Sequence, residues 1–258
     1  MYKIGIDVGG MSIKAGLVVN GEIIQRSVKE TNQSGGLENI IEDITELVND
    51  LLDKSELEIN NIDSIGIGFP GVVTSEGRVT CVNIGLENAL IIPKLEERLK
   101  GTIVRAGNDA NVAALGEMWK GAAAGHKSGV MVTLGTGVGG GVIINGKIIT
   151  GAHGAGGEIG HIHVDDEVPG ACGCGNHGCL EHVASANGIV RLAKWMLEQN
   201  AVKTVLDPET MSAREIWDAV KDGDTFACEV AERFGKYLGL ALSAVAGTAD
   251  PEVFVIGG

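Results

Sequence analysis

Apolar residues along this chain recur with two different periods, which predict an alternation of strands and helices. Short apolar runs end at glycine pairs or polar turns, as buried strands do. Longer segments carry an apolar residue at every third or fourth position, the spacing of one buried helix face. The predicted strands cover residues 2–6, 12–19, 22–26, 64–68, 102–106, 130–144 (with a glycine turn inside) and 147–149, and then 252–256. The predicted helices cover residues 37–52, 109–118, 184–199, 212–221 and 224–246.

The order strand, glycine turn, strand occurs twice, in residues 2–19 and again in residues 130–144. A repeated unit of this kind predicts two α/β domains related by duplication. We expect a smaller N-terminal lobe over residues 1–117 and a larger C-terminal lobe over residues 118–258. Because the last strand runs into a glycine pair, the second lobe is expected to continue beyond residue 258.

Composition narrows the possible functions. The chain has 20 Lys and Arg against 34 Asp and Glu, a formal net charge of −14, which argues against a nucleic-acid-binding face. Glycine supplies 40 of 258 residues, about twice its ordinary share of roughly 7%. Residues 128–146 carry no charge but include seven glycines, so they do not predict a membrane span. The chain opens without a basic and apolar leader, and its odd number of cysteines favours a reducing compartment, the cytoplasm.

Both glycine turns are candidates for binding phosphate. Asp7 precedes Gly9-Gly10 in the first, and the second runs from Thr136 to Gly141. Glycine lets main-chain N–H groups approach a phosphate because no Cβ stands in the way. A plain hairpin turn is the alternative, but two such turns at matching places favour phosphate. The pattern is neither a dinucleotide-binding fingerprint nor a Walker loop.

Asn108-Asp109 lies where the strand of residues 102–106 gives way to a helix. A carboxylate at a helix N-terminus is expected to stay ionised and ready to accept a proton from a hydroxyl group. The alternative is that one of the two side chains only caps the helix.

Three cysteines follow the pattern C-x-C-x4-C, at Cys172, Cys174 and Cys179. Three thiols at this spacing in a reducing compartment predict a zinc site with one further ligand. The candidates for the fourth ligand are His161, His163, His177 and His182, and we favour the remote His161, which would fasten the loop to the core. Four protein ligands make the site structural. Glu158 and Glu181 flank it and suit sugar hydroxyls, although exposed glutamates usually serve solubility.

Several motifs together resemble one known family. They are DVGGMSIK (residues 7–14), GFPGVV (68–73), GNDANVAALGE (107–117), LGTGVGGG (134–141), GEIGH (157–161) and CGCGNHGCLE (172–181). The chain resembles the ROK family of sugar kinases and repressors, within the actin-like ATPase superfamily, and most of all its glucokinases from Gram-positive bacteria. The resemblance covers essentially the whole chain.

This resemblance implies a duplicated actin-like ATPase fold (ribonuclease H-like), with two lobes and a cleft between them, and ATP-dependent phosphorylation of a hexose 6-hydroxyl. It implies a role for each of two carboxylates: Asp109 acts as the general base, and Asp7 positions Mg²⁺. It assigns the sugar to Gly71, Asn108, Asp109, Glu158, His161 and Glu181, and Zn²⁺ to His161, Cys172, Cys174 and Cys179. It assigns ATP to Asp7, Gly9, Gly10, Met11, Ser12, Lys14, Thr136, Gly137, Gly139, Gly140, Gly257 and Gly258.

The resemblance leaves alternatives open. Kinases for N-acetylglucosamine, N-acetylmannosamine, mannose or fructose share these motifs, and so does a non-catalytic sugar-sensing module. Repressors of the family carry a DNA-binding segment ahead of the sugar domain, whereas the phosphate motif here begins at Asp7. Met11 stands where the family usually has threonine. A homodimer or homotetramer is implied as well.

Overall fold

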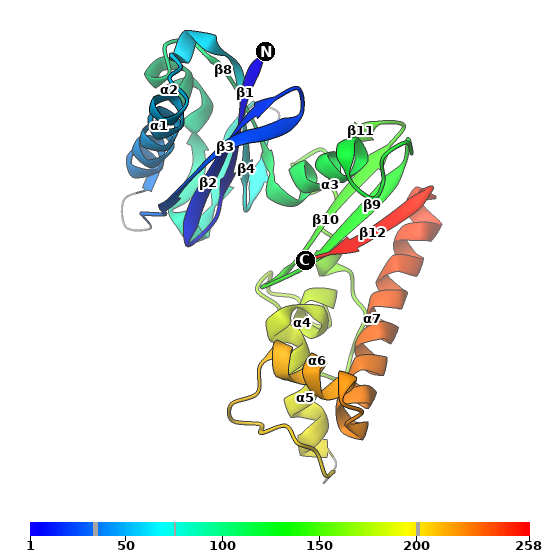
Figure 1. Cartoon of the computed structure of the whole chain (residues 1–258). Coiled ribbons are helices and arrows are strands. Elements are labelled where there is room, and N and C mark those ends of the chain that lie inside the picture. Colours follow the sequence, from blue (N-terminus) through cyan, green and yellow to red (C-terminus); the bar gives the residue numbers. More distant parts are fainter. Residues whose placement is uncertain (33–35, 75, 200–201) are drawn as a thin grey trace. The chain divides into compact units, whose positions relative to one another are not determined.

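The computed structural model describes residues 1–32, 36–74, 76–199 and 202–258, and the chain divides into two compact units (Figure 1). The first unit comprises Met1–Val112 and Thr150–Ala155, and the second comprises Ala113–Ile149 and Gly156–Gly258. The division falls within helix α3 (Asp109–Lys120), the same helix that contains the boundary predicted after residue 117. Each unit is described by itself below.

The first unit is built on a five-stranded sheet with the order β3-β2-β1-β4-β8. The antiparallel strands are β1 (Tyr2–Val8), β2 (Ser12–Val19) and β3 (Glu22–Glu30), and the parallel ones are β4 (Ile62–Phe69) and β8 (Ile103–Asn108). A small second sheet contains β5 (Val72–Val73), β6 (Arg78–Cys81) and β7 (Leu86–Leu90). The parallel strands all end at one edge, where Asp7 and Asp109 are found.

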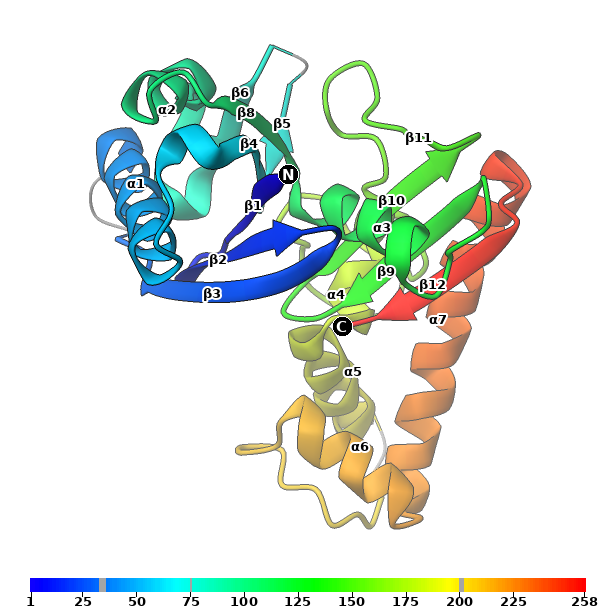
Figure 2. The ribbon, with the colours of Figure 1, turned by 45° about the horizontal axis from the view of Figure 1, so that its top comes forward.

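Helices α1 (Gly36–Lys54) and α2 (Ile91–Arg98) lie side by side against one face of the large sheet (Figure 2). The apolar spacing of α1 buries a continuous row from Ile40 to Leu52. Alternate residues of β1, namely Ile4, Ile6 and Val8, point into the same core. The apolar face of the helix, with its period of 3.6 residues, therefore packs against the apolar face of the strand, with its period of 2. Both faces lie in one buried layer, as the sequence predicts.

The second unit repeats the strand order of the first, β11-β10-β9-β12. Strands β9 (Gly129–Leu134), β10 (Val138–Ile144) and β11 (Lys147–Ile148) are antiparallel, and β12 (Val253–Gly257) joins β9 in parallel. The same order and directions as β3-β2-β1-β4 show the duplication that the sequence predicts. The core of this unit is built from the sheet together with α4 (Leu180–Ala184), α5 (Ala186–Gln199), α6 (Ala213–Lys221) and α7 (Thr225–Ala249).

Helix α6 begins with a capping box. Ser212 accepts a hydrogen bond from the Glu215 main chain, and the Glu215 carboxylate accepts one from the Ser212 N–H. Sequence periodicity missed α2 and the strands β5 to β7. These elements are short, and α2 starts without a side-chain cap and contains Pro93, so its local signals are weak.

In the described part of the chain, no helix combines the length and the apolar character needed to cross a membrane.

Candidate functional site

Asp7 and Asp109 lie at the carboxyl edge of the first unit's sheet. Asp7 on β1 is in register with Gly68 on β4, and Gly68 is in register with Gly107 on β8. Asp109 follows at the start of α3, so close to β4 that a Cβ at Gly68 would lie 3.4 Å from the Asp109 Cα. Two strands that are distant in sequence thus bring two carboxylates to one edge.

Burial changes the electrostatics of Asp109. Desolvation raises the pKa of Asp109 above its ordinary value, and the negative charge of Asp7 acts in the same direction. The Ala110 N–H donates a 2.8 Å hydrogen bond to the Asp109 carboxylate, which favours the ionised form but is outweighed. Burial therefore acts on the Asp109 carboxyl against the helix N-terminus, which favours its ionised form. A raised proton affinity makes this carboxylate a better proton acceptor.

Asn108, rather than Asp109, caps helix α3. Its Oδ1 accepts a 3.0 Å hydrogen bond from the Asn111 N–H, and its Nδ2 donates to the carbonyl oxygen of Gly71 at 3.1 Å. Gly71 is closely enclosed, because a Cβ there would collide with the main-chain oxygen of Thr80. The capping alternative thus accounts for Asn108 and leaves the Asp109 carboxylate for chemistry.

The first glycine turn (residues 9–11) joins β1 to β2. The Gly9 N–H donates to the Ser12 carbonyl at 3.0 Å, and Thr31 Oγ1 donates to the Gly9 carbonyl at 2.7 Å. Met11 is 85% exposed, so its side chain has no role in the core. A Cβ at Gly10 would meet no described atom within 4 Å, which keeps that face of the turn open.

Ser12 and Lys14 continue from this turn into β2. Ser12 is the first residue of the strand, and Lys14 pairs directly with Asp7 across the β1–β2 ladder. The structure thereby brings all the first-unit residues of the predicted nucleotide site to the neighbourhood of Asp7.

The second glycine turn (residues 135–137) joins β9 to β10 in the second unit. The Gly135 N–H donates to the Gly137 carbonyl at 3.0 Å, which closes the turn around Thr136. The predicted glycine run divides here, because Gly139 and Gly140 lie inside β10. A Cβ at Gly140 would collide with the carbonyl oxygen of Gly157, so this glycine permits close packing of the strand.

Gly257 and Gly258 lie at the same end of the sheet as the second glycine turn. Gly257 on β12 pairs with Thr133 on β9, and Thr133 pairs on its other side with Gly139. Gly258 has a φ of +133° and approaches the main chain of Leu134 so closely that a Cβ would collide with it. The structure therefore brings together the second-unit residues of the predicted nucleotide site.

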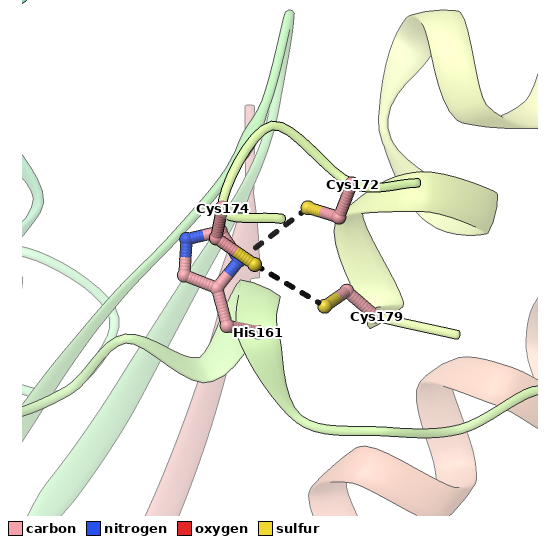
Figure 3. A group of neighbouring side chains, drawn as sticks. All are labelled: His161, Cys172, Cys174 and Cys179. Carbon is pink, nitrogen blue, oxygen red and sulfur yellow. Dashed lines mark hydrogen bonds between the residues drawn. The ribbon is translucent and has the colours of Figure 1, made fainter. Parts of the chain in front are cut away.

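Four potential metal ligands meet in the second unit (Figure 3). Their ligating atoms lie within 4.8 Å of one another, with 3.6 Å between Cys172 Sγ and His161 Nδ1 and 3.7 Å between the Sγ atoms of Cys174 and Cys179. His161 comes from the short 3-10 helix η3 (Ile159–His161), and the cysteines come from the end of the metal loop (residues 162–179).

The other three candidate histidines point elsewhere. His163 contacts the carbonyl oxygen of His177 through Nδ1 and the carboxylate of Asp166 through Nε2. His177 contacts the carbonyl of Gly170, and His182 contacts that of Pro169. Sequence could not choose among four histidines, whereas the tertiary structure places only His161 beside the cysteines.

A set of three sulfur ligands and one nitrogen ligand fits tetrahedral zinc and leaves no position open, so the site is of the structural kind. Burial raises the pKa of Cys172, and it raises the pKa of Cys179 to about 12, while the Asn176 N–H lowers that of Cys174. Metal binding must therefore displace protons from at least two buried thiols.

Glu158 and Glu181 each lie close to one residue of the metal cluster, Glu158 to His161 and Glu181 to Cys172. Glu158 precedes η3, with 4.0 Å between its Oε2 and His161 Nε2. Glu181 is in the first turn of α4, and its Oε2 accepts a 3.0 Å hydrogen bond from the Val138 N–H. The predicted sugar ligands are thus divided: Gly71, Asn108 and Asp109 belong to the first unit, and Glu158, His161 and Glu181 to the second.

Sequence reasoning missed the residues that hold the metal loop. Asp165 is buried. Its carboxylate accepts a 2.6 Å hydrogen bond from the Tyr237 hydroxyl and a 2.7 Å hydrogen bond from the Val168 N–H. Burial raises the pKa of Tyr237 to about 12, so its hydroxyl remains a donor. Arg233 stacks 5.0 Å from the Trp195 ring centre and donates to the Tyr237 oxygen. An aspartate in an acidic run gives no local signal of burial.

Comparisons with known proteins identify sugar kinases as relatives of the chain. The chain is 40% identical to a glucokinase of Halalkalibacterium halodurans, over 100% of this chain and 80% of that protein. It is 31% identical to an N-acetyl-D-glucosamine kinase of Haemophilus influenzae, over 98% of this chain and 83% of the relative. A ROK family glucokinase from Streptomyces griseus, solved with glucose and AMPPNP, superposes with a TM-score of 0.78 at 33% identity, covering 100% of this chain and 83% of that one.

The two related sheets accordingly form the duplicated actin-like fold that the motifs predict. The model of the ROK family matches residues 3–258, and the chain belongs to the ROK family.

Proposed function

We propose that this chain is a glucokinase, which transfers the γ-phosphoryl group of ATP to the 6-hydroxyl of D-glucose. The observation that carries the proposal is the Asp109 carboxylate, which is half-buried at the start of α3 and has a raised pKa to which the charge of Asp7 contributes. The 40% identity to a glucokinase along the whole chain supports glucose as the acceptor.

Asp109 is the general base in this proposal. Its carboxylate takes the proton of the sugar 6-hydroxyl while that oxygen forms a bond to the γ-phosphorus and the bond from the phosphorus to the bridging oxygen of ADP breaks. Its raised pKa suits this role, because proton affinity is increased at the acceptor. Asn108, which is held by its cap and by Gly71, orients the sugar next to it.

Glu158, His161 and Glu181 supply further contacts to the sugar hydroxyls. Zinc, held by His161, Cys172, Cys174 and Cys179, contributes rigidity, since all these residues lie on or beside the metal loop. Outer residues that fix the geometry of a site strongly influence its function.

The nucleotide is bound by main-chain groups of the two glycine turns, with Lys14 and Ser12 close to the first and Gly257-Gly258 close to the second. Asp7 would hold Mg²⁺, which when bound would supply charge neutralisation for the transferred phosphate. Its exposed place at the carboxyl edge of the sheet, next to the first glycine turn, supports this role.

N-acetylglucosamine is the second candidate acceptor, because a kinase for that sugar is also similar over nearly the whole chain. The two sugars differ at carbon 2, and the contacts there decide between them. We further propose a cytoplasmic homodimer or homotetramer; the five free cysteines fit a reducing compartment, and light scattering of the purified protein measures the assembly.

The test is a coupled assay of ADP release with Mg-ATP and a panel of glucose, N-acetylglucosamine, N-acetylmannosamine, mannose and fructose, with a reaction without sugar as the control. We expect the highest kcat/KM with glucose, and a phosphorus NMR signal of a phosphate ester on carbon 6. A higher kcat/KM with N-acetylglucosamine than with glucose would show that N-acetylglucosamine is the preferred acceptor. Sugar binding without turnover would instead indicate a sugar-sensing module.

A further inference from the structure

Three contacts join the hairpin β9–β10 to the segments on both sides of the metal loop. From α4, Glu181 Oε2 accepts the Val138 N–H at 3.0 Å. From the first residue of α5, the Ala186 N–H donates to the Gly135 carbonyl at 2.8 Å. From η3, Gly160 packs on β10 so closely that a Cβ would collide with the Val138 carbonyl oxygen. The second glycine turn is therefore held from both ends of the metal loop.

The hairpin leaves no free space at these contacts. A Cβ at Gly137 would lie 2.5 Å from Glu181 Oε2, and a Cβ at Gly140 would lie 2.7 Å from Ile159 Cδ1. Real Cβ atoms do not approach other atoms so closely, because repulsion rises steeply at such distances. The second glycine turn therefore packs closely against the Glu181 carboxylate, and β10 packs closely against Ile159.

The segments η3 and α4, which contact the hairpin, also lie next to metal ligands. His161 ends η3, and Cys179 is the N-cap of the five-residue helix α4, two positions before Glu181. A helix of five residues is not stable by itself, so its position depends on what holds its start. Glu181 Oε1 also lies 3.8 Å from Cys172 Sγ. A ligand bond at Cys179 therefore holds the start of α4, and with it the main chain that carries Glu181.

We propose that metal binding and nucleotide binding are thermodynamically coupled through Glu181. A metal on the four ligands removes the freedom of the metal loop and so prepares the second glycine turn for phosphate. By linkage, the nucleotide raises the metal affinity by the same factor. This inference rests on the proposed function, because it takes the turn as a phosphate site and the cluster as a zinc site. In the proposed function zinc supports the sugar ligands; here it also strengthens the binding of the nucleotide.

The first experiment compares Gly137→Ala with Gly135→Ala by zinc competition against a chromophoric chelator, without sugar or nucleotide. Both substitutions add one methyl group to the same turn. The methyl at residue 137 displaces Glu181, so we expect zinc affinity to fall by about 5- to 150-fold, the usual range of coupling between sites. The methyl at residue 135 meets no described atom within 4 Å, and zinc affinity is expected to stay at the wild-type value.

The second experiment uses the wild-type chain, so it does not depend on how the variants fold. The dissociation constant of Mg-AMPPNP is measured by calorimetry on metal-free and on zinc-loaded protein, again without sugar. Zinc affinity is then measured with and without Mg-AMPPNP. We expect tighter nucleotide binding in the zinc-loaded protein, and the same factor in both directions.

Equal AMPPNP affinity with and without zinc, together with equal zinc affinity in Gly137→Ala and Gly135→Ala, overturns the coupling and leaves the kinase proposal intact. A wild-type chain that binds no zinc overturns the metal assignment and the coupling with it. Loss of sugar phosphorylation in a chain that still shows reciprocal binding would count against the proposed function alone.

Discussion

Replacing Asp109 by asparagine separates the two consequences of its burial, one for catalysis and one for stability. The carboxamide has nearly the same volume, and its oxygen still accepts the hydrogen bond that the Ala110 N–H donates to Asp109 at 2.8 Å. What disappears is the negative charge that desolvation and Asp7 disfavour. The substitution therefore removes the proton acceptor while it leaves the local packing unchanged.

The expected loss of kcat follows from the role of a general base. Removal of such a group typically lowers the rate by about 10²- to 10⁴-fold, which corresponds to about 2.7–5.4 kcal/mol in the activation free energy at 1.36 kcal/mol per factor of ten. Sugar binding persists in part, because Asn108 remains capped and bonded to Gly71. In the wild type, kcat/KM is expected to fall with decreasing pH already above the usual pKa range of aspartate, since the pKa of Asp109 is raised.

The substitution Asp109→Asn is expected to lower kcat but to raise the thermal stability of the protein. A raised pKa in the folded state means that the protonated form of Asp109 stabilises the fold below the unfolded pKa, and that this contribution is lost as the pH rises through the folded pKa. At pH 7 the wild type therefore carries a buried charge that Asp109→Asn lacks. We expect a higher unfolding temperature for the variant at pH 7, with a difference that shrinks toward acid pH.

The assay combines steady-state ADP release, sugar binding and thermal unfolding at several pH values without ligands. Asp63→Asn is the matched control, because this exposed residue of β4 changes the net charge equally without a buried site. A kcat within tenfold of the wild type would refute the role of Asp109 as general base. An unfolding temperature below that of Asp63→Asn at pH 7 would refute the argument from burial.

Three further predictions concern the supports of the site. Tyr237→Phe keeps the ring but leaves the buried Asp165 carboxylate without its hydroxyl donor, so urea unfolding should show a loss of about 1–3 kcal/mol, and a loss below 0.5 kcal/mol would contradict this. Gly71→Ala forces a methyl group against the Thr80 carbonyl oxygen, and the free energy of unfolding should fall by about 1–3 kcal/mol; an unchanged value in the same assay would show that the strand relaxes easily. Cys174→Ser removes one of four ligands, so metal analysis should find less zinc and ADP release should slow in parallel, whereas full activity without zinc would separate the metal from catalysis.

Local patterns in the sequence were sufficient for most of the fold. The spacing of apolar residues predicted α1 and the strands on both sides of each glycine turn, because the periods of helix and strand are properties of neighbouring residues. The repeated strand-turn-strand order predicted the duplication, which the matching sheet orders show. The spacing of Cys172, Cys174 and Cys179 likewise predicted a shared metal cluster, since all three lie within eight residues of chain.

Only the tertiary structure decided which groups meet across long stretches of chain. It selected His161 among four histidines, and it brought Glu181 against the main chain of Val138. It also showed that the proton affinity of Asp109 is set by burial more than by the helix on which it lies. The physical reason is that solvent exclusion and contact distances depend on residues far apart in sequence. Periodicity and the type of a ligand depend only on residues that are neighbours in the sequence.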